Sequence, residues 1–316
     1  MAKYLIKRVL TVIPVLIGIS LLTYMLITML PGSPIDFMLN SNYTAEDYKQ
    51  LLEEFGFDAP WYEQYWLWLQ GILQGEWGTS YQTNQPVLQM IADRMPSTLL
   101  LMGTGMALSI ILSIPLGVLC AVRQNSALDY SLSTVSFLGS SFPGFFMAMV
   151  IIYFFNVKLG WFPASGMYSS VGDRTFADLA LHLTLPACTI AFSHMGQMVR
   201  YVRGSVLEEL GKDYLRTAAS KGVRPSARVM IHALRNSLLS VITLIGMQIP
   251  SLFGGSVIIE KIFAWPGVGT LLNSSTTARD YPVLLIMILI SAIVVALANL
   301  LTDIIYAVVD PRIRLK

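Results

Sequence analysis

Six stretches of this chain run for 21 residues or more without a single Asp, Glu, Lys or Arg. A helix needs about 20 consecutive apolar residues to cross the hydrocarbon core of a bilayer. The fourth stretch is the least apolar, since it contains His182, His194 and Gln197. The pattern predicts an all-α polytopic membrane protein with six transmembrane helices. The candidate spans are Val9–Leu30, Met95–Val122, Tyr130–Val157, Leu179–Val199, Asn236–Ile259 and Tyr281–Thr302.

The composition excludes other classes. Charged residues make up 13% of the chain and hydrophobic residues 54%, whereas an average soluble domain carries about 25% charged residues. So few charges do not cover a soluble surface, which excludes an ordinary soluble enzyme. The high apolar content and a net charge of only +2 exclude a disordered chain. Cys120 and Cys188 lie in apolar runs, so we expect buried thiols rather than a disulfide or a metal site.

The first span is preceded by Lys3, Lys7 and Arg8, as a signal peptide would be. Its apolar run is longer than that of a signal peptide, and Pro31-Gly32-Ser33-Pro34 follows it without a small-x-small cleavage site. We therefore expect the span to be retained.

Basic residues are distributed unequally between the two sets of loops. The N-terminus, the 2–3 and 4–5 connections and the C-terminal tail hold 15 of the 21 lysines and arginines. The other loops hold 13 of the 19 acidic residues. Because basic loops stay on the cytoplasmic side, both termini are predicted to face the cytoplasm.

The connection between spans 1 and 2, Pro31–Arg94, is too long for a plain loop, so we expect it to be structured. Thr44–Asp47 is typical of a helix start, with an apolar stripe at Leu51, Leu52 and Phe55. Trp61–Trp68 then places five aromatic residues within eight. Such density is typical of a membrane–water boundary. Two interpretations stay open: a cap that contacts an external partner, or an interfacial helix that anchors the loop.

The connection between spans 4 and 5, 200–235, is basic and predicted to be mostly helical, with interruptions at Gly222 and Pro225. An apolar face is predicted through Leu207, Leu210, Tyr214 and Ala218. The residues alone allow two readings, a helix on lipid headgroups or a helix that docks into a cytoplasmic protein. They favour lipid slightly.

This same segment carries a family resemblance. Asp213–Gly222 and His232–Leu238 resemble the permease subunits of binding-protein-dependent ABC importers, in particular the dipeptide/oligopeptide/nickel branch. In that family the segment is a coupling loop that inserts into a cleft of the ATPase subunit. Arg216 stands where the general pattern has Glu, as in the peptide branch, and Ser240 stands where that branch often has Pro. The resemblance implies a coupling role for Tyr214, Arg216, Thr217, Ala218, Ala219, Lys221 and Gly222.

The physical chemistry of these residues suits such a contact. Ala218 and Ala219 are small and allow a close approach, and Arg216 and Lys221 pair with acidic groups. Gly222 is expected to take a positive φ and end the helix.

Other motifs extend the resemblance over nearly the whole chain. They indicate the type I ABC importer permease architecture, with residues 1–30 as N-terminus and span 1, 31–94 as an external loop or cap, and 95–316 as a five-span core. The motifs are Lys7–Leu10 through Pro31–Pro34, Gly75–Ser80 with Pro86-Val87, Glu260–Gly269, Arg279–Pro282, Asn299–Asp303 and Asp310–Arg312.

The resemblance implies a non-catalytic permease subunit of an ATP-driven importer, with di- or oligopeptides as the expected cargo. Its implied partners are a second, homologous permease, two ATPase subunits that bind ATP and Mg, an external substrate-binding protein and the lipid bilayer of a bacterial or archaeal cell (inner) membrane. No cofactor, metal or nucleic acid is expected on this chain.

Two absences in the sequence agree with this assignment. No Gly-x4-Gly-Lys-Ser/Thr phosphate loop is present, since Gly211-Lys212 is followed by Asp213. The chain therefore cannot be the ATPase. No catalytic constellation is found either, and Ser165-Gly166 resembles an intramembrane serine protease only faintly.

Polar residues in the spans have structural and functional interpretations. Gln197 and Gln248 are expected to line a path or to bond helices together, while Asn299 and Asp303 project from one helical face. For Asp303 a structural role is favoured over substrate contact. His182 and His194 have no carboxylate partner in the sequence pattern, and packing or hydrogen bonding is favoured over metal binding.

Two other assignments of the whole chain remain as alternatives. The same architecture imports nickel, glutathione or another small solute. A stand-alone secondary transporter would need more ionisable residues near the membrane centre than Asp303 and two histidines.

Overall fold

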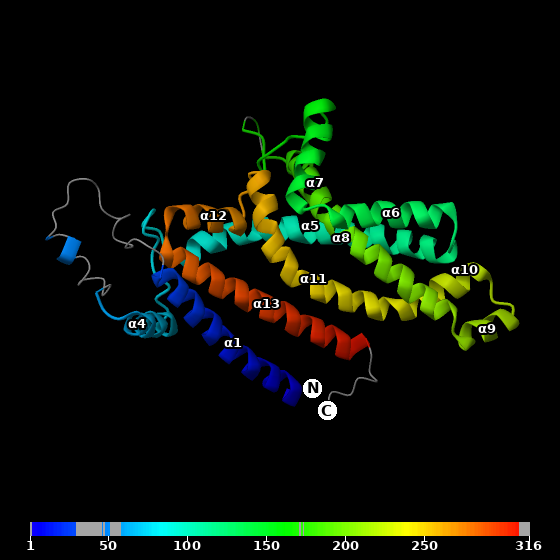
Figure 1. The fold of residues 1–316 in the computed structure, drawn as a ribbon, viewed down its shortest axis with the longest axis horizontal. Coiled ribbons are helices and arrows are strands. Elements are labelled where there is room, and N and C mark those ends of the chain that lie inside the picture. The colour runs from blue at the N-terminus through cyan, green and yellow to red at the C-terminus, as the bar shows by residue number, and fades with distance from the viewer. Residues whose placement is uncertain are drawn as a thin grey trace. The chain divides into compact units, whose positions relative to one another are not determined.

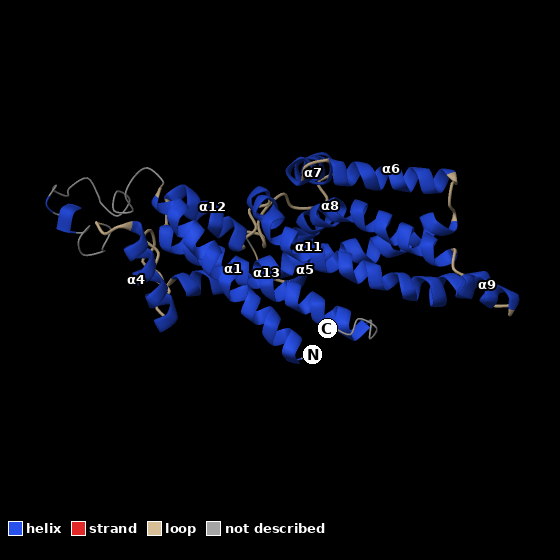
Figure 2. Ribbon diagram, turned by 60° about the horizontal axis from the view of Figure 1, so that its bottom comes forward, coloured by secondary structure: helices blue, strands red, loops and turns tan. Residues whose placement is uncertain are grey.

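The computed structural model describes residues 2–29, 46, 48–50, 58–170, 172 and 174–309, and the side chains of residues 2–9, 239–240, 250–255, 303 and 305–309 lie outside this description. The described part consists of helices, turns and one isolated antiparallel bridge, Thr79 to Pro86 (Figure 2). The helices are α1 (Ala2–Thr28), α4 (Trp61–Gln74), α5 (Val87–Val122), α6 (Ala127–Ser141), α7 (Gly144–Ile151), η1 (Ile152–Lys158), α8 (Phe176–Leu210), α9 (Asp213–Ser220), α10 (Pro225–Ala227), η2 (Arg228–Ala233), α11 (Leu234–Ile262), α12 (Val268–Ala278) and α13 (Tyr281–Val309).

Four helices are long and apolar enough to cross a membrane, and two bent helix pairs raise the possible number of spans in the described chain to six. This agrees with the six spans expected from the sequence. The four are Leu10–Thr28, Val87–Val122, Phe176–Leu210 and Tyr281–Thr302.

The third predicted span, Tyr130–Val157, is a bent pair of helices rather than a single straight helix. Ala127–Ser141 and Gly144–Lys158 meet at an angle of 109°. Pro143 lies at the bend, and the residue before it, Phe142, has an extended backbone with φ −82° and ψ 139°. Proline disfavours the helical conformation in its predecessor, so α6 ends there and α7 starts in a new direction. Pro225–Leu238 and Val241–Ile249 form the second bent pair, at 41°.

The chain divides into two compact units. The first unit comprises Met1–Pro96 and Gly267–Leu297, and the second comprises Ser97–Pro266 and Ala298–Lys316. Two of the three boundaries fall inside α5 and α13, so these two helices contribute to both units, and the third lies between α11 and α12. The three-part division expected from the sequence stays a prediction.

In the second unit, α8 packs closely against its neighbours because small residues line the contacts. A Cβ added at Gly105 of α5 would lie 2.6 Å from the Ile190 side chain, and one added at Gly196 of α8 would lie 2.0 Å from the Ser136 backbone oxygen. Figure 1 shows α6 and α8 side by side. Small residues at membrane helix contacts allow backbones to approach this closely.

The first unit holds two apolar clusters. One joins the start of α5 to α12 and α13 through residues that include Val87, Leu271 and Ile286. The other joins α1, α4 and α13 through Tyr24, Tyr65 and Leu285. The helix start predicted at Thr44–Asp47, its apolar stripe at Leu51, Leu52 and Phe55, and the motif segments Pro31–Pro34 and Asp310–Arg312 fall largely or wholly outside the described residues.

Candidate functional site

The segment between α8 and α11 folds as a short helix that follows a break in the chain. α8 ends at Leu210, and α9 begins at Asp213 after Gly211 and Lys212. Figure 1 shows α9 beyond the end of α8. The single apolar face predicted through Leu207, Leu210, Tyr214 and Ala218 is therefore divided between two helices. α8 continues for 11 residues beyond Val199, where the predicted span ends, in agreement with the helical character expected of the segment that follows.

Gly222 terminates α9 as its sequence predicted. Its φ is +78°, a conformation that residues with a Cβ rarely adopt. The Gly222 N–H donates to the Ala219 carbonyl at 3.0 Å, and the Val223 N–H donates to the Ala218 carbonyl at 3.1 Å. These two hydrogen bonds satisfy carbonyls in the last turn of α9, and the turn directs the chain toward α10.

Most of the predicted coupling residues lie at the surface of α9. Arg216 is 78% exposed and pairs with Asp213 of the same helix at 3.5 Å. Leu215 is buried, although the sequence analysis did not single it out. The signal was present, because it is the only leucine within the polar run Lys212–Ser220. Tyr214, Thr217, Ala219, Lys221 and Gly222 are exposed, and Ala218 is half-buried.

A chain of polar contacts, which we call the α9 joint, ties α9 to the helices on either side. The Tyr214 hydroxyl donates to Glu209 Oε2 of α8 at 2.5 Å, and Asn236 Nδ2 of α11 donates to the Tyr214 oxygen at 2.9 Å. Lys212 also contacts Glu209. Burial and the bond to Glu209 raise the pKa of Tyr214, and the Glu209 carboxylate raises the pKa of Lys212. The joint therefore links three helices through one tyrosine side chain.

A second polar contact fixes α6 to α8 two turns before the joint. Arg203 Nε and Nη2 donate to the two oxygens of Asp129 at 2.7 and 2.8 Å. The Asn125 N–H also donates to Asp129, at 3.0 Å, and Ser126 caps α6. Asp129 is 2% exposed. Bidentate pairing of this kind fixes geometry as well as charge.

The predicted path residues do not share one environment. Gln248 is buried in α11, whereas Gln197 and Asn299 are exposed on α8 and α13. The Asp303 side chain lies outside the described residues. A path lined by these residues stays a prediction.

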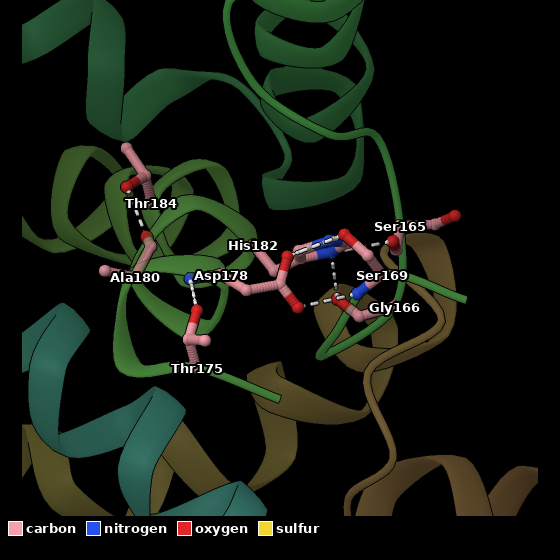
Figure 3. Close-up of polar contacts among 8 residues, drawn as sticks. All are labelled: Ser165, Gly166, Ser169, Thr175, Asp178, Ala180, His182 and Thr184. Carbon is pink, nitrogen blue, oxygen red and sulfur yellow. Dashed lines mark hydrogen bonds and ion pairs between the residues drawn. The ribbon is translucent and has the colours of Figure 1, made fainter. Parts of the chain in front are cut away.

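His182 holds the loop that precedes α8. Its Nδ1 lies 3.1 Å from the carbonyl oxygens of both Ser165 and Gly166, and its Nε2 lies 3.4 Å from Ser169 Oγ (Figure 3). Asp178 lies 3.5 Å from Nε2, one turn earlier on α8. The expected hydrogen-bonding role of His182 is confirmed. The sequence analysis nevertheless missed Asp178 as its carboxylate partner.

This cluster contains a serine, a histidine and an aspartate but lacks the geometry of a hydrolase triad. In a triad, the imidazole bridges serine and aspartate through its two different nitrogens. Here both Ser169 and Asp178 approach Nε2, and the Ser169 hydroxyl donates to Asp178 at 2.6 Å. Among the described residues, no three His, Cys, Asp or Glu side chains gather as a metal site.

Two of the motifs that carry the family resemblance, Gly75–Ser80 and Arg279–Pro282, meet in the first unit. The Ser80 hydroxyl donates to Asp280 Oδ2 at 2.5 Å, and the Tyr81 N–H donates to Oδ1 at 3.1 Å. Ser80 Oγ in turn accepts from the backbone N–H groups of Gln82 and Thr83 at 3.2 and 3.0 Å. Ser80 and Asp280 are both buried.

Comparison with known proteins gives concordant matches. Residues 113–315 match the model of the binding-protein-dependent transport system inner membrane component, and residues 1–102 match that of its N-terminal region. The oligopeptide transport system permease protein AppB of Bacillus subtilis is 42% identical, covering 99% of both chains. The glutathione transport system permease protein GsiC of Escherichia coli is 37% identical, covering 100% of both.

A solved structure supports the fold. The MetNI methionine ABC transporter in an inward-facing conformation aligns with a TM-score of 0.57 at 19% identity, over 71% of this chain and 98% of that chain. The shared architecture is that of a type I ABC importer permease. With both family models matched and relatives aligned from end to end, the chain belongs to the family of binding-protein-dependent transport system inner membrane components, as a multi-pass permease subunit of an ABC importer.

Proposed function

We propose that this permease subunit imports di- or oligopeptides, and that α9 with the Gly222 turn is its contact with the ATPase. The observation that carries the coupling role is the α9 joint: an exposed helix is bonded through Tyr214 to α8 and α11 together. A helix that receives force from a partner must be held firmly by the elements it moves. Arg216 and Lys221, both exposed, are available to acidic groups of that partner.

The proposed assembly has a second, homologous permease, two ATPase subunits that bind ATP and Mg, and an external substrate-binding protein. Both termini and α9 face the cytoplasm in this arrangement. The distribution of basic residues supports that orientation, since 15 of 21 lie on the same set of loops.

The proposed mechanism is alternating access. ATP binding closes the ATPase pair and displaces α9. The joint carries this displacement to α8 and α11. Tight contacts at their glycines favour movement of these helices as rigid bodies. The path then opens outward, and hydrolysis resets it. This chain supplies the path and the lever, whereas the ATPase supplies the energy.

Peptide cargo is supported by the names of relatives at 41–42% identity, which are oligopeptide or peptide permeases. Glutathione is the second candidate, because permeases named for it align over the full length at 37–38%. Nickel or another small solute remains a third possibility for the same architecture.

The test is peptide-stimulated ATP hydrolysis and transport in liposomes that contain the complete transporter, with Gly222→Trp compared with the native chain. We expect peptide and binding protein to stimulate hydrolysis together, and Gly222→Trp to abolish transport. Gly160→Trp is a matched control, since Gly160 also has a positive φ, +63°, and a Cβ added at either glycine meets open space. Stimulation by glutathione or nickel alone would overturn the peptide assignment, and transport without ATP would favour a secondary transporter.

A further inference from the structure

α4 presents three different faces around its axis. At about 100° per residue, Tyr65, Leu69 and Ile72 fall on one side, and these residues are buried or half-buried. Tyr62, Trp66 and Leu73 fall within one narrow arc beside them, with exposed fractions of 56, 57 and 79%. We call these three residues the α4 apolar stripe.

The third face of α4 is polar. Glu63, Gln70 and Gln74 occupy the arc on the far side of the α4 apolar stripe, and all three are exposed. Leu67 borders this polar arc and is exposed as well. Around the helix, the face buried against the protein is therefore followed by the α4 apolar stripe and then by the polar face. A helix that lies in the plane of a membrane surface and also packs against a span requires this order.

The contact with α1 fixes the position of α4 along the axis of that span. Tyr65 OH lies 3.0 Å from Ser20 Oγ, and the rings of Tyr24 and Tyr65 pack edge to face at 5.7 Å (Figure 1 shows the two helices). Ser20 and Tyr24 lie eight and four residues before Thr28, where α1 ends. At 1.5 Å per residue, that is about 6–12 Å from the end of the span. Interfacial helices bury their apolar face to about 5–10 Å at this boundary.

The exposed face of α1 at this level is apolar, as expected of a surface that meets lipid. Leu21, Leu22 and Met25 of α1 are exposed apolar residues of a membrane span, beside the residues that hold α4. Such a face is suited to lipid, and α4, which packs beside it, lies at a level that lipid reaches. Glu63 is the only charged residue of α4, so attachment relies on aromatic and aliphatic insertion, for which Trp and Tyr at the membrane–water boundary are suited.

We propose that the α4 apolar stripe rests in the membrane interface and contacts lipid, so that α4 is a membrane-surface anchor of the first unit. The inference does not depend on cargo, on the α9 joint or on the direction of transport. It favours the interfacial anchor among the two compatible interpretations of the aromatic segment given by the sequence.

The test uses spin labels on single cysteines in the complete transporter, reconstituted in phosphatidylcholine–phosphatidylglycerol vesicles. Cys120 and Cys188 are first replaced by Ala. Trp66→Cys and Leu73→Cys probe the stripe, and Gln70→Cys and Gln74→Cys are controls on the polar face. Collision of each label with molecular oxygen, which partitions into lipid, is compared with collision with a water-soluble nickel chelate.

The ratio of oxygen to nickel accessibility is expected to be several-fold higher at positions 66 and 73 than at positions 70 and 74. Equal ratios at all four positions would overturn the proposal, because the stripe would then face water. Protection of positions 66 and 73 from both reagents would also overturn it, in favour of a protein contact. Leu73 keeps the test valid if Trp66→Cys disturbs folding, since its side chain is 79% exposed and supports no packing.

Discussion

Ser80 donates a hydrogen bond of 2.5 Å to Asp280, which lies 200 residues later in the chain. One carboxylate thereby holds a turn between α4 and α5 against the turn between α12 and α13. The same carboxylate accepts the Tyr81 N–H at 3.1 Å. Two short motifs that look unrelated in the sequence are thus two halves of one buried contact.

Asp280→Asn is expected to destabilise the first unit by about 2 kcal/mol, because an amide NH₂ would face a donor from Ser80 or Tyr81 in a buried site. The measurement is the thermal unfolding midpoint of the purified transporter. Glu76→Gln is the control, since Glu76 is an exposed carboxylate in the same loop. Equal midpoints for the two variants would show that the contact contributes nothing.

Tyr214→Phe is expected to uncouple the transporter without unfolding it. The change removes the one oxygen that accepts from Asn236 and donates to Glu209, so α9 loses its bond to both α8 and α11. The number of peptides transported per ATP hydrolysed should fall several-fold, while basal hydrolysis persists. Tyr201→Phe, at an exposed tyrosine on α8, should leave the ratio unchanged. An unaltered ratio in Tyr214→Phe would rule out the joint as the path of coupling.

Local patterns predicted local features well. Long uncharged runs located the membrane helices, and Gly222 took the positive φ that a helix-ending glycine favours. Hydrophobicity marked the apolar stretch up to Val199 but not the end of α8 at Leu210, because a helix extends beyond its apolar stretch when its own hydrogen bonds and packing allow it. The bend at Pro143 was detectable as a proline, but its angle of 109° depends on what α7 packs against.

Contacts between residues far apart in the chain could not be predicted from the sequence. Nothing in a single chain pairs Ser80 with Asp280, or Asp129 with Arg203, which lies 74 residues later. The Asp178–His182 pair could have been predicted, since the two residues are four positions apart on one helix. It was missed because Asp178 falls outside the stretch predicted to be membrane-spanning.

Gly196→Ala is expected to prevent α8 from packing on α6. The new Cβ would lie 2.0 Å from the Ser136 backbone oxygen, which cannot move aside as a flexible side chain does. The two helices must separate, at a cost of about 2 kcal/mol or more. Gly103→Ala is the control, because a Cβ there meets open space, and alanine favours a helix by about 1 kcal/mol. Unfolding midpoints should therefore shift in opposite directions. A midpoint in Gly196→Ala as high as in Gly103→Ala would mean that the contact is looser than described.

Arg203→Ala is expected to destabilise the second unit by about 3 kcal/mol, since it leaves the Asp129 carboxylate buried without its cation. Arg203→Lys should lie between alanine and the native chain, because an ammonium keeps the charge but cannot reproduce the two parallel bonds. Arg200 lies three residues earlier on α8, where its guanidinium covers the Phe137 ring at 5.7 Å. Arg200→Ala should cost only about 0.5–1 kcal/mol, as for an exposed cation–π contact. Unfolding of the three variants in detergent separates the cases. If Arg203→Ala and Arg200→Ala proved equally stable, the pair with Asp129 would be no stronger than a surface contact, and α6 would owe its position to the small residues along α8 alone.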